Sequence, residues 1–186
     1  LAVYLDLLVT WNRKMNLVGP GDWRTILTTL VADSFHLAAF VKELPLPHDP
    51  LCLDPGAGAG LPGIPLRILW TQGRYHMVES RQKRALFLRH ALMHCRLERT
   101  WVVQGRVESL SEELARADLI ISRAFMPWKE LLHVCTGLTE EGGTVVVLAN
   151  QPPSGEGVQG WTPGLARPYD LPSGRRYFWS FIKAPS

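Results

Sequence analysis

The chain has 186 residues, of which 46% are hydrophobic and 20% charged. That length predicts one domain, and the composition is typical of a folded globular protein and excludes a largely disordered chain. Uncharged apolar runs are shorter than the ~18–20 residues of a membrane span, and no secretion signal is recognisable. Three widely spaced cysteines without a C-x-x-C pair argue against a disulfide framework and favour the cytoplasm. The net charge of +3 indicates a mild preference for polyanionic partners.

Residues 1–46 are predicted to form a helical N-terminal subdomain. Apolar residues recur at helical spacing over 1–15 and again over 23–43. A Gly-Pro-Gly turn separates the two stretches, and Asp22 is a suitable N-cap for the second. Three prolines then end the helical pattern, so we place a domain boundary between residues 46 and 47.

From residue 51 the sequence alternates between short apolar strands and helices. Strands are expected at 51–54, 75–79, 100–104, 118–122, 144–148 and 177–182, and helices at 62–70, 80–95 and 127–138. The segment 150–168 is rich in Pro, Gly and Gln without periodicity, and we interpret it as a long loop. Continuous apolar strands that alternate with helices predict an α/β domain over 47–186, with a doubly wound, mostly parallel sheet covered on both faces.

The most informative segment is the glycine-rich run that follows the first predicted strand. Ligands of open α/β sheets bind at that edge, where glycines let the backbone turn sharply and approach a ligand. One pattern, G-x-G-x-x-G, begins at Gly58 and is the dinucleotide fingerprint. The other, G-x-G-x-G, begins at Gly56 and is typical of S-adenosylmethionine sites. The candidate cofactor-binding glycines are Gly56, Gly58 and Gly60.

With either pattern, Glu79 follows about 20 residues later, at the end of the next strand, where a carboxylate can hold both ribose hydroxyls. Two features favour the methyl donor over a dinucleotide. Pro62 and Pro65 remove N–H groups that a pyrophosphate would bind at the start of a helix, whereas a sulfonium cofactor has no phosphate. Asp54 supplies an acid near the cationic end of the donor. A tight strand–helix turn without a ligand is the remaining interpretation.

Several segments together resemble one protein family. They are residues 11–17, 33–34, 54–65, 79–84, 105–108 and 122–125, of which L-P-G-I-P after the glycines and the tetrad S-R-A-F are the most specific. The sequence resembles the glucose-inhibited division protein B family, bacterial methyltransferases that modify N7 of a guanine in 16S ribosomal RNA of the small subunit. The resemblance covers residues 4–149 and, more weakly, 174–184.

The resemblance implies a class I, Rossmann-like methyltransferase fold with a seven-stranded type of sheet, and S-adenosyl-L-methionine as cofactor. It places Gly56 and Leu61 beside the methionine and ribose portion of that cofactor. Glu79 is then expected on the ribose, and Val107 and Glu108 beside the adenine.

The same resemblance implies positions for basic residues. Arg123 is expected at the cofactor pocket as a positioning residue, and Lys83, Arg84 and Arg176 match RNA-facing positions. Arg81 lies on the same predicted helix as Lys83 and is expected to join them. The implied partner is 16S rRNA within the small ribosomal subunit. The protein is expected to be a monomer, and no membrane partner is expected.

The sequence departs from the family pattern in three places. Leu30 stands where the family usually has His, and Ala149 stands where it usually has Lys. The loop that contains Pro152, Pro153 and Gly155 is also unlike the family's. The change at residue 149 removes an expected RNA contact at that edge of the sheet.

The chemistry implied for this target needs no general base, because neutral guanine N7 already carries a lone pair. The enzyme then acts by alignment and by exclusion of water. No metal is expected, since His90 and His94 lie near Cys95 without an acid or a second cluster. A small-molecule methyltransferase, a non-catalytic RNA-binding protein with the same fold, and a nicotinamide oxidoreductase remain as alternatives.

Overall fold

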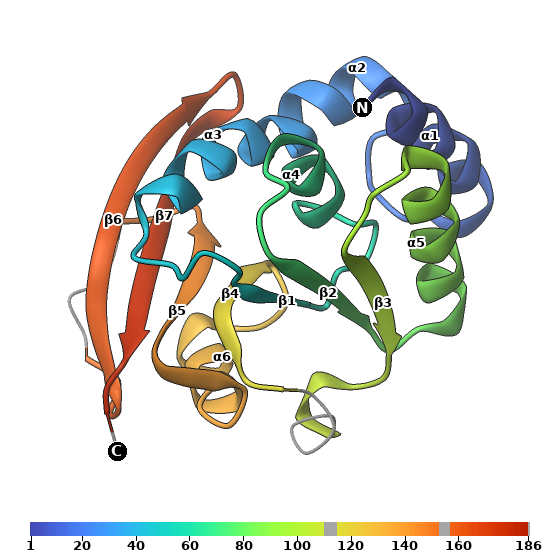
Figure 1. The fold of residues 1–186 in the computed structure, drawn as a ribbon. Helices are drawn as coiled ribbons and strands as arrows, with labels where there is room; N and C mark the ends of the chain where they lie inside the picture. The colour runs from blue at the N-terminus through green and yellow to red at the C-terminus, as the bar shows by residue number, and fades with distance from the viewer. Residues whose placement is uncertain (110–114, 153–156, 186) are drawn as a thin grey trace.

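The computed structural model describes residues 1–109, 115–152 and 157–185, and its centre is a seven-stranded sheet. The strands are β1 (Leu51–Pro55), β2 (Arg74–Glu79), β3 (Thr100–Gln104), β4 (Ala117–Arg123), β5 (Thr139–Ala149), β6 (Trp161–Leu171) and β7 (Gly174–Lys183). Their order is β3-β2-β1-β4-β5-β7-β6 (Figure 1). Strands β1 to β5 pair in parallel, whereas β7 pairs antiparallel with both β5 and β6. The predicted mostly parallel α/β sheet is therefore confirmed.

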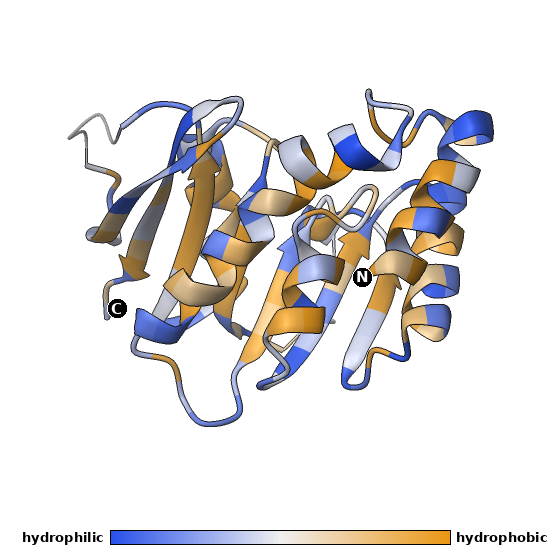
Figure 2. Ribbon diagram, turned by 90° about the horizontal axis from the view of Figure 1, so that it is seen from above, coloured by the Kyte–Doolittle hydropathy of each residue, from blue (hydrophilic) through white to orange (hydrophobic). Residues whose placement is uncertain are grey.

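Helices cover both faces of this sheet. They are α1 (Ala2–Met15), α2 (Trp23–Ile26), α3 (Ala32–Phe40), α4 (Gly63–Leu69), α5 (Gln82–Cys95) and α6 (Trp128–Cys135), with short turns of other helix types at Leu27–Val31, Val41–Glu43 and Val107–Ser109. Figure 1 shows α2, α3 and α4 over one face and α6 on the other. In Figure 2, orange, hydrophobic residues run along strands in the middle of the sheet, whereas the helices at the right alternate between orange and blue.

The apolar side chains of the strands divide into two cores, one on each face. Cys52 belongs to the cluster beneath α3 and α4, whereas its neighbour Leu53 belongs to the cluster beneath α6. Leu119 and Ile120 of β4 are split in the same way. Successive side chains of a strand point to opposite faces, so a strand that is buried on both faces needs a continuous apolar run. That run is the pattern from which these strands were predicted.

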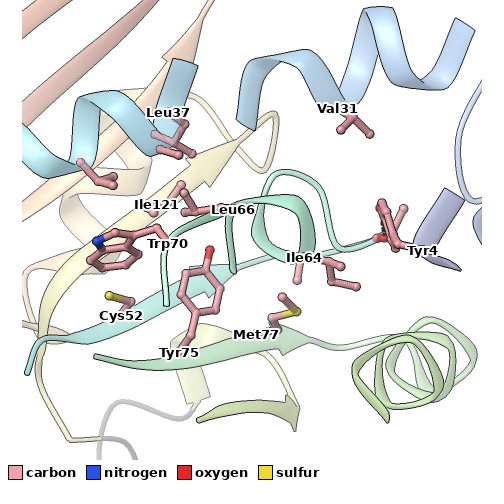
Figure 3. Packing of buried hydrophobic residues seen from close by; sticks show 14 of the residues in the cluster. Tyr4, Val31, Leu37, Cys52, Ile64, Leu66, Trp70, Tyr75, Met77 and Ile121 are labelled. Carbon is pink, nitrogen blue, oxygen red and sulfur yellow. Dashed lines mark hydrogen bonds between the residues drawn. The ribbon is translucent and has the colours of Figure 1, made fainter. Parts of the chain in front are cut away.

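The N-terminal helices contribute directly to the first of these cores. Figure 3 shows Tyr4, Val31 and Leu37 in the same cluster as Ile64 of α4 and Tyr75 of β2. The hydroxyl of Tyr4 donates to Ala59 O in the glycine loop at 2.8 Å, so α1 also helps to fix that loop. A division of the chain at residues 46 and 47 stays a prediction.

The second N-terminal helix is interrupted, although it was predicted as one run over 23–43. Asp22 caps it as predicted, with its Oδ1 accepting from Thr25 N at 3.0 Å. A wider π turn follows over Leu27–Val31, where the hydroxyls of Thr28 and Thr29 donate to main-chain carbonyls one turn back. Such side-chain bonds compete with the regular main-chain ladder.

Among the described residues, one helical run is long and apolar enough by length and composition to cross a membrane. It is Trp23–Glu43, and 44% of its most apolar window is buried inside the fold. Its apolar side chains pack against α4 and the sheet, as those of a core helix do.

The predicted loop over 150–168 is wrong in its second half, because β6 begins at Trp161. This strand lies at the edge of the sheet and most of its side chains are exposed, so it has no continuous apolar run. Pro163 and Pro168 are tolerated because an edge strand pairs on one side only. Pro153 and Gly155 lie outside the described residues.

Candidate functional site

The loop after β1 is held against β2 by its own backbone. The N–H groups of Gly56 and Ala57 both donate to Val78 O, at 2.9 and 3.1 Å. Gly56 and Gly58 have φ angles of 70° and 58°, in the left-handed region where a side chain is strained. A Cβ on Gly56 would also overlap the ring of Phe125. Both glycines are therefore required by the conformation and close packing of the loop.

A cavity of about 200 Å³, which we call the donor cavity, lies at the carboxyl ends of β1, β2, β3 and β4. Its walls include Gly56, Val78, Ser80, Gly105, Val107 and Phe125. Four successive strand ends thus contribute to it, because parallel strands bring their carboxyl ends to one edge of the sheet. A ligand was expected at this edge of the sheet, and Gly56 and Val107 of these six residues were expected to contact it.

Glu79 stands between two of the cavity's wall residues at the end of β2. Its side chain is buried, with Oε2 accepting from Gly58 N at 3.0 Å and Oε1 from Arg81 N at 2.8 Å. A carboxylate oxygen has two lone pairs, so each oxygen retains one for a further donor. Two hydroxyl groups on adjacent carbons, as in a ribose, match this arrangement.

The residues predicted beside the adenine also reach the donor cavity. Val107 and Glu108 open a short helical turn after β3, and both line the cavity. Val107 is buried and provides an apolar surface, whereas Glu108 is exposed at the rim. The ring of Phe125 stands against Gly56 and adds a second apolar surface. A flat aromatic group between these surfaces would be desolvated on both sides.

Three predicted cofactor residues point elsewhere. Asp54 is almost fully buried beneath α4, where its Oδ2 accepts from the hydroxyl of Tyr75 at 3.3 Å. Burial raises the pKa of Asp54 to about 7, although the bond from Tyr75 opposes that rise. A Cβ on Gly60 would lie 2.5 Å from Ile64 Cδ1, and Leu61 packs on the same core. These residues anchor the loop to α4 and do not line the donor cavity.

Arg123, at the end of β4, turns away from the donor cavity toward the N-terminal helices. Its Nη1 donates to Leu30 O at 2.7 Å and lies 3.1 Å from Asp33 Oδ2. Asp33 is buried, and its Oδ1 accepts from the hydroxyl of Tyr169 on β6 at 2.8 Å. Arg123 therefore joins α3 and the sheet, and it lines a second cavity with Arg176 of β7.

The basic residues predicted to face RNA separate into two places. Arg81, Lys83 and Arg84 lie at the start of α5, where they line a surface groove of about 490 Å³ together with Lys14 of α1. Among the described residues, none of these four cations makes an ion pair. Arg176 lies elsewhere, on β7 beside the edge strand β6, and it donates to Asn150 Oδ1.

Several residues of the two cavities were not among the predicted site residues. Ser80 and Gly105 follow parallel strands directly and Phe125 lies two residues after β4, so the rule that ligands bind at strand ends is the signal that finds them. Tyr169 carried no such signal, because it lies in β6, most of which has the sequence pattern of a loop. In the part of the chain that is described, no three His, Cys, Asp or Glu side chains are grouped as metal ligands.

Comparison with known sequences identifies similar proteins along almost the whole chain. The model of the GidB family, described as rRNA small subunit methyltransferase G, matches residues 1–159. Ribosomal RNA small subunit methyltransferase G of Nitratidesulfovibrio vulgaris strain DP4 is 52% identical over 180 residues, which are 97% of this chain and 83% of that protein. Its counterpart in Lawsonia intracellularis is 48% identical over 183 residues, 97% of this chain and 84% of that protein.

Solved structures with the same fold are much more distant in sequence. The O-methyltransferase TomG of Streptomyces achromogenes, in complex with S-adenosylmethionine, has a TM-score of 0.66 at 14% identity, over 98% of this chain and 90% of that chain. MtNAS in complex with MTA and tNA has a TM-score of 0.68 at 14% identity, over 97% of this chain and 71% of that chain. The chain thus has the Rossmann-like class I methyltransferase fold.

Proposed function

The chain belongs to the GidB family of rRNA small subunit methyltransferase G proteins, and on that premise we propose that it transfers a methyl group from S-adenosyl-L-methionine to N7 of a guanine in 16S rRNA. The observation that carries the proposal is the buried carboxylate of Glu79, which is fixed by Gly58 N and Arg81 N at the edge of the donor cavity. Binding the donor, aligning the reacting atoms and binding the RNA each require particular residues of this chain.

The donor cavity supplies the contacts that S-adenosyl-L-methionine requires. Glu79 accepts from the two ribose hydroxyls, and Val107 and Phe125 cover the faces of the adenine. The backbone at Gly56, without a side chain, lies along the methionine portion. When bound, the cofactor supplies an electrophilic methyl group on a cationic sulfur.

The chain's contribution to the reaction is placement. Neutral guanine N7 attacks without losing a proton, so no side chain has to act as a general base. Alignment of the acceptor nitrogen with the methyl group and exclusion of water then provide the acceleration.

The groove at the start of α5 holds the RNA backbone. Lys14, Arg81 and Lys83 are exposed and bind phosphate oxygens next to the donor cavity. The target guanine is unstacked or presented in a loop, because protein side chains read the A-form major groove poorly. A local basic surface is sufficient for a substrate that is already folded, which agrees with a net charge of only +3. The cytoplasm is the expected location and a monomer the expected state.

Labelled methyl transfer tests the proposal. The protein is incubated with methyl-labelled S-adenosyl-L-methionine and either small or large ribosomal subunits from cells that lack this methylation. We expect label in the RNA of the small subunit, none in the large subunit, and much less in the small subunit with Glu79→Ala when the donor concentration is near the wild-type dissociation constant. Label in neither subunit, with donor binding intact, would contradict the proposal.

A further inference from the structure

We propose that the second cavity, between the ends of β4 and β5 and the β6–β7 hairpin, holds the acceptor guanine and that Arg123 and Arg176 bind its O6. We call it the acceptor cavity; its walls include Asp33, Arg123, Ala124, Leu148, Tyr169 and Arg176. The inference rests on the proposed function and adds to it the place and the recognition of the base.

Consecutive residues of one turn line the acceptor cavity and the donor cavity. Ala124 lines the acceptor cavity together with Arg123, whereas the next residue, Phe125, lines the donor cavity. Ala124 has a φ angle of 50°, a conformation that is uncommon for a residue with a Cβ and that recurs at functional sites as well as at helix ends. This turn sends Arg123 and Phe125 into different cavities. A base in one is therefore next to a methyl group held in the other.

The acceptor cavity offers an apolar wall to a planar ring system. Its volume is about 230 Å³, and Leu148 and Ala149 form an apolar part of the wall, against which the plane of a base can lie.

The polar part of the wall offers two guanidinium groups in fixed positions. Arg123 is held by Leu30 O and by Asp33, and its side chain is only 20% exposed. Arg176 is held by the side-chain oxygen of Asn150. A guanidinium group has donors and no acceptor. The edge of the base that faces these groups must therefore carry acceptors.

That requirement separates guanine from adenine. Guanine carries the acceptors O6 and N7 on one edge, whereas adenine carries an amino group in place of O6. Donation from Arg123 or Arg176 to O6 leaves the neighbouring N7 directed toward the turn at Ala124. An adenine in the same position would bring its amino group against donors, which leaves buried polar groups unpaired.

The cation at position 176 can be tested apart from the folding role of Arg123. Loss of Arg123 leaves the buried carboxylate of Asp33 without its cation, which can unfold the protein. Arg176→Gln removes a partly exposed cation that donates to a single exposed side chain. Arg175→Gln is the matched control, because Arg175 is the adjacent residue of β7, pairs with Asp170 and has a side chain that is 61% exposed.

The experiment measures the dissociation constants of four ribonucleoside 5′-monophosphates by calorimetry, with the demethylated donor product present. The probes are those of guanine, hypoxanthine, 2-aminopurine and adenine. Guanine and hypoxanthine have O6, and we expect them to bind at least about tenfold more tightly than the other two. Arg176→Gln should remove most of that difference, and Arg175→Gln should leave it unchanged.

Three results would overturn the inference. They are equal affinity for all four probes, hypoxanthine binding as weakly as adenine, or the same loss in Arg175→Gln as in Arg176→Gln. Each leaves the proposed function standing if the wild-type protein still labels small subunits. Failure of that labelling with the four affinities as expected would instead contradict the proposed function alone.

Discussion

The carboxylate of Glu79 accepts the backbone N–H of Gly58 at 3.0 Å, across 21 residues of sequence. One side chain thereby closes the glycine loop onto the end of β2, between the wall residues Val78 and Ser80 of the donor cavity. On the proposed function, the shape of the loop and the recognition of the ribose are coupled through this single group. Variants at either residue should therefore lower donor affinity more than they lower the stability of the fold.

Glu79→Ala should weaken binding of S-adenosyl-L-methionine by roughly 1–3 kcal/mol, because hydrogen bonds from two hydroxyls to a charged acceptor are lost. Glu79→Gln keeps one oxygen acceptor and should lose less. Calorimetric titration measures both, with Glu140→Ala as a control that removes an exposed carboxylate from β5. An unchanged dissociation constant in folded Glu79→Ala would reject the assignment of the ribose to this carboxylate.

Gly58→Ala should keep the fold and lose donor affinity. A Cβ there would meet nothing closer than Gly56 O at 3.6 Å, so the cost is the strained φ angle of 58°, about 1–2 kcal/mol. Gly137→Ala is the control, since a Cβ at Gly137 has no atom within 4 Å and no strained angle. Urea unfolding of both variants measures the loss of stability caused by backbone strain, and donor titration measures the loss of affinity. Normal donor affinity in Gly58→Ala would mean that the glycine serves only the turn.

Asp54→Asn should change how stability depends on pH. Burial raises the pKa of Asp54 to about 7 in the folded protein, whereas an unfolded Asp titrates near 3.9. The folded state therefore holds the proton more tightly, so this stability is complete below pH 4 and is lost as the pH rises through 7. The free energy of unfolding of wild type should fall relative to Asp54→Asn by on the order of 2–4 kcal/mol between pH 4 and pH 8.

Urea unfolding of wild type and Asp54→Asn at several pH values in that range measures the difference. Other titrating groups are shared by the two proteins and cancel. A difference that stays constant with pH would show that Asp54 is ionised in the folded protein. Because Asp54 lies beneath α4 and away from the donor cavity, donor affinity should change little.

How far the sequence predicts this molecule depends on how each element is buried. Strands β1 and β4 are covered on both faces, so they carry continuous apolar runs that are visible without a structure. Strand β6 lies at an edge with most side chains exposed, and its prolines resemble those of a loop. The place of Tyr169 and its hydrogen bond to Asp33 were therefore not predictable from the sequence.

The candidate site shows the same limit at the level of single side chains. A glycine loop and an acid at the next strand end predicted the place of Glu79, because strand ends meet at one edge. The direction of Arg123 was not predictable, since it depends on the φ angle of Ala124 and on the partners Leu30 and Asp33, which are 93 and 90 residues away in sequence. Asp54 adjoins the glycines in sequence, but the alternation of β1 sends it beneath α4.

Arg81→Gln together with Lys83→Gln should weaken RNA binding without a change in donor affinity. The groove they line is exposed, and each lost phosphate contact lowers the slope of log affinity against log salt by about 0.7–0.9. Arg84 is kept in this variant because its Nη1 approaches the loop at Gly58. Arg99→Gln is the control, a cation that pairs with Asp49 at the other end of the sheet. An equal slope in the double variant would show that the groove does not contact phosphate.

The position of the transferred methyl group tests the proposed chemistry most directly. Small subunits that lack the modification are methylated in a single turnover with labelled S-adenosyl-L-methionine, and the RNA is digested to nucleosides and separated. We expect the label in 7-methylguanosine, because a neutral ring nitrogen reacts without a general base. Label in a nucleoside that is methylated on an exocyclic amine or a ribose hydroxyl would require removal of a proton and would contradict attack by guanine N7.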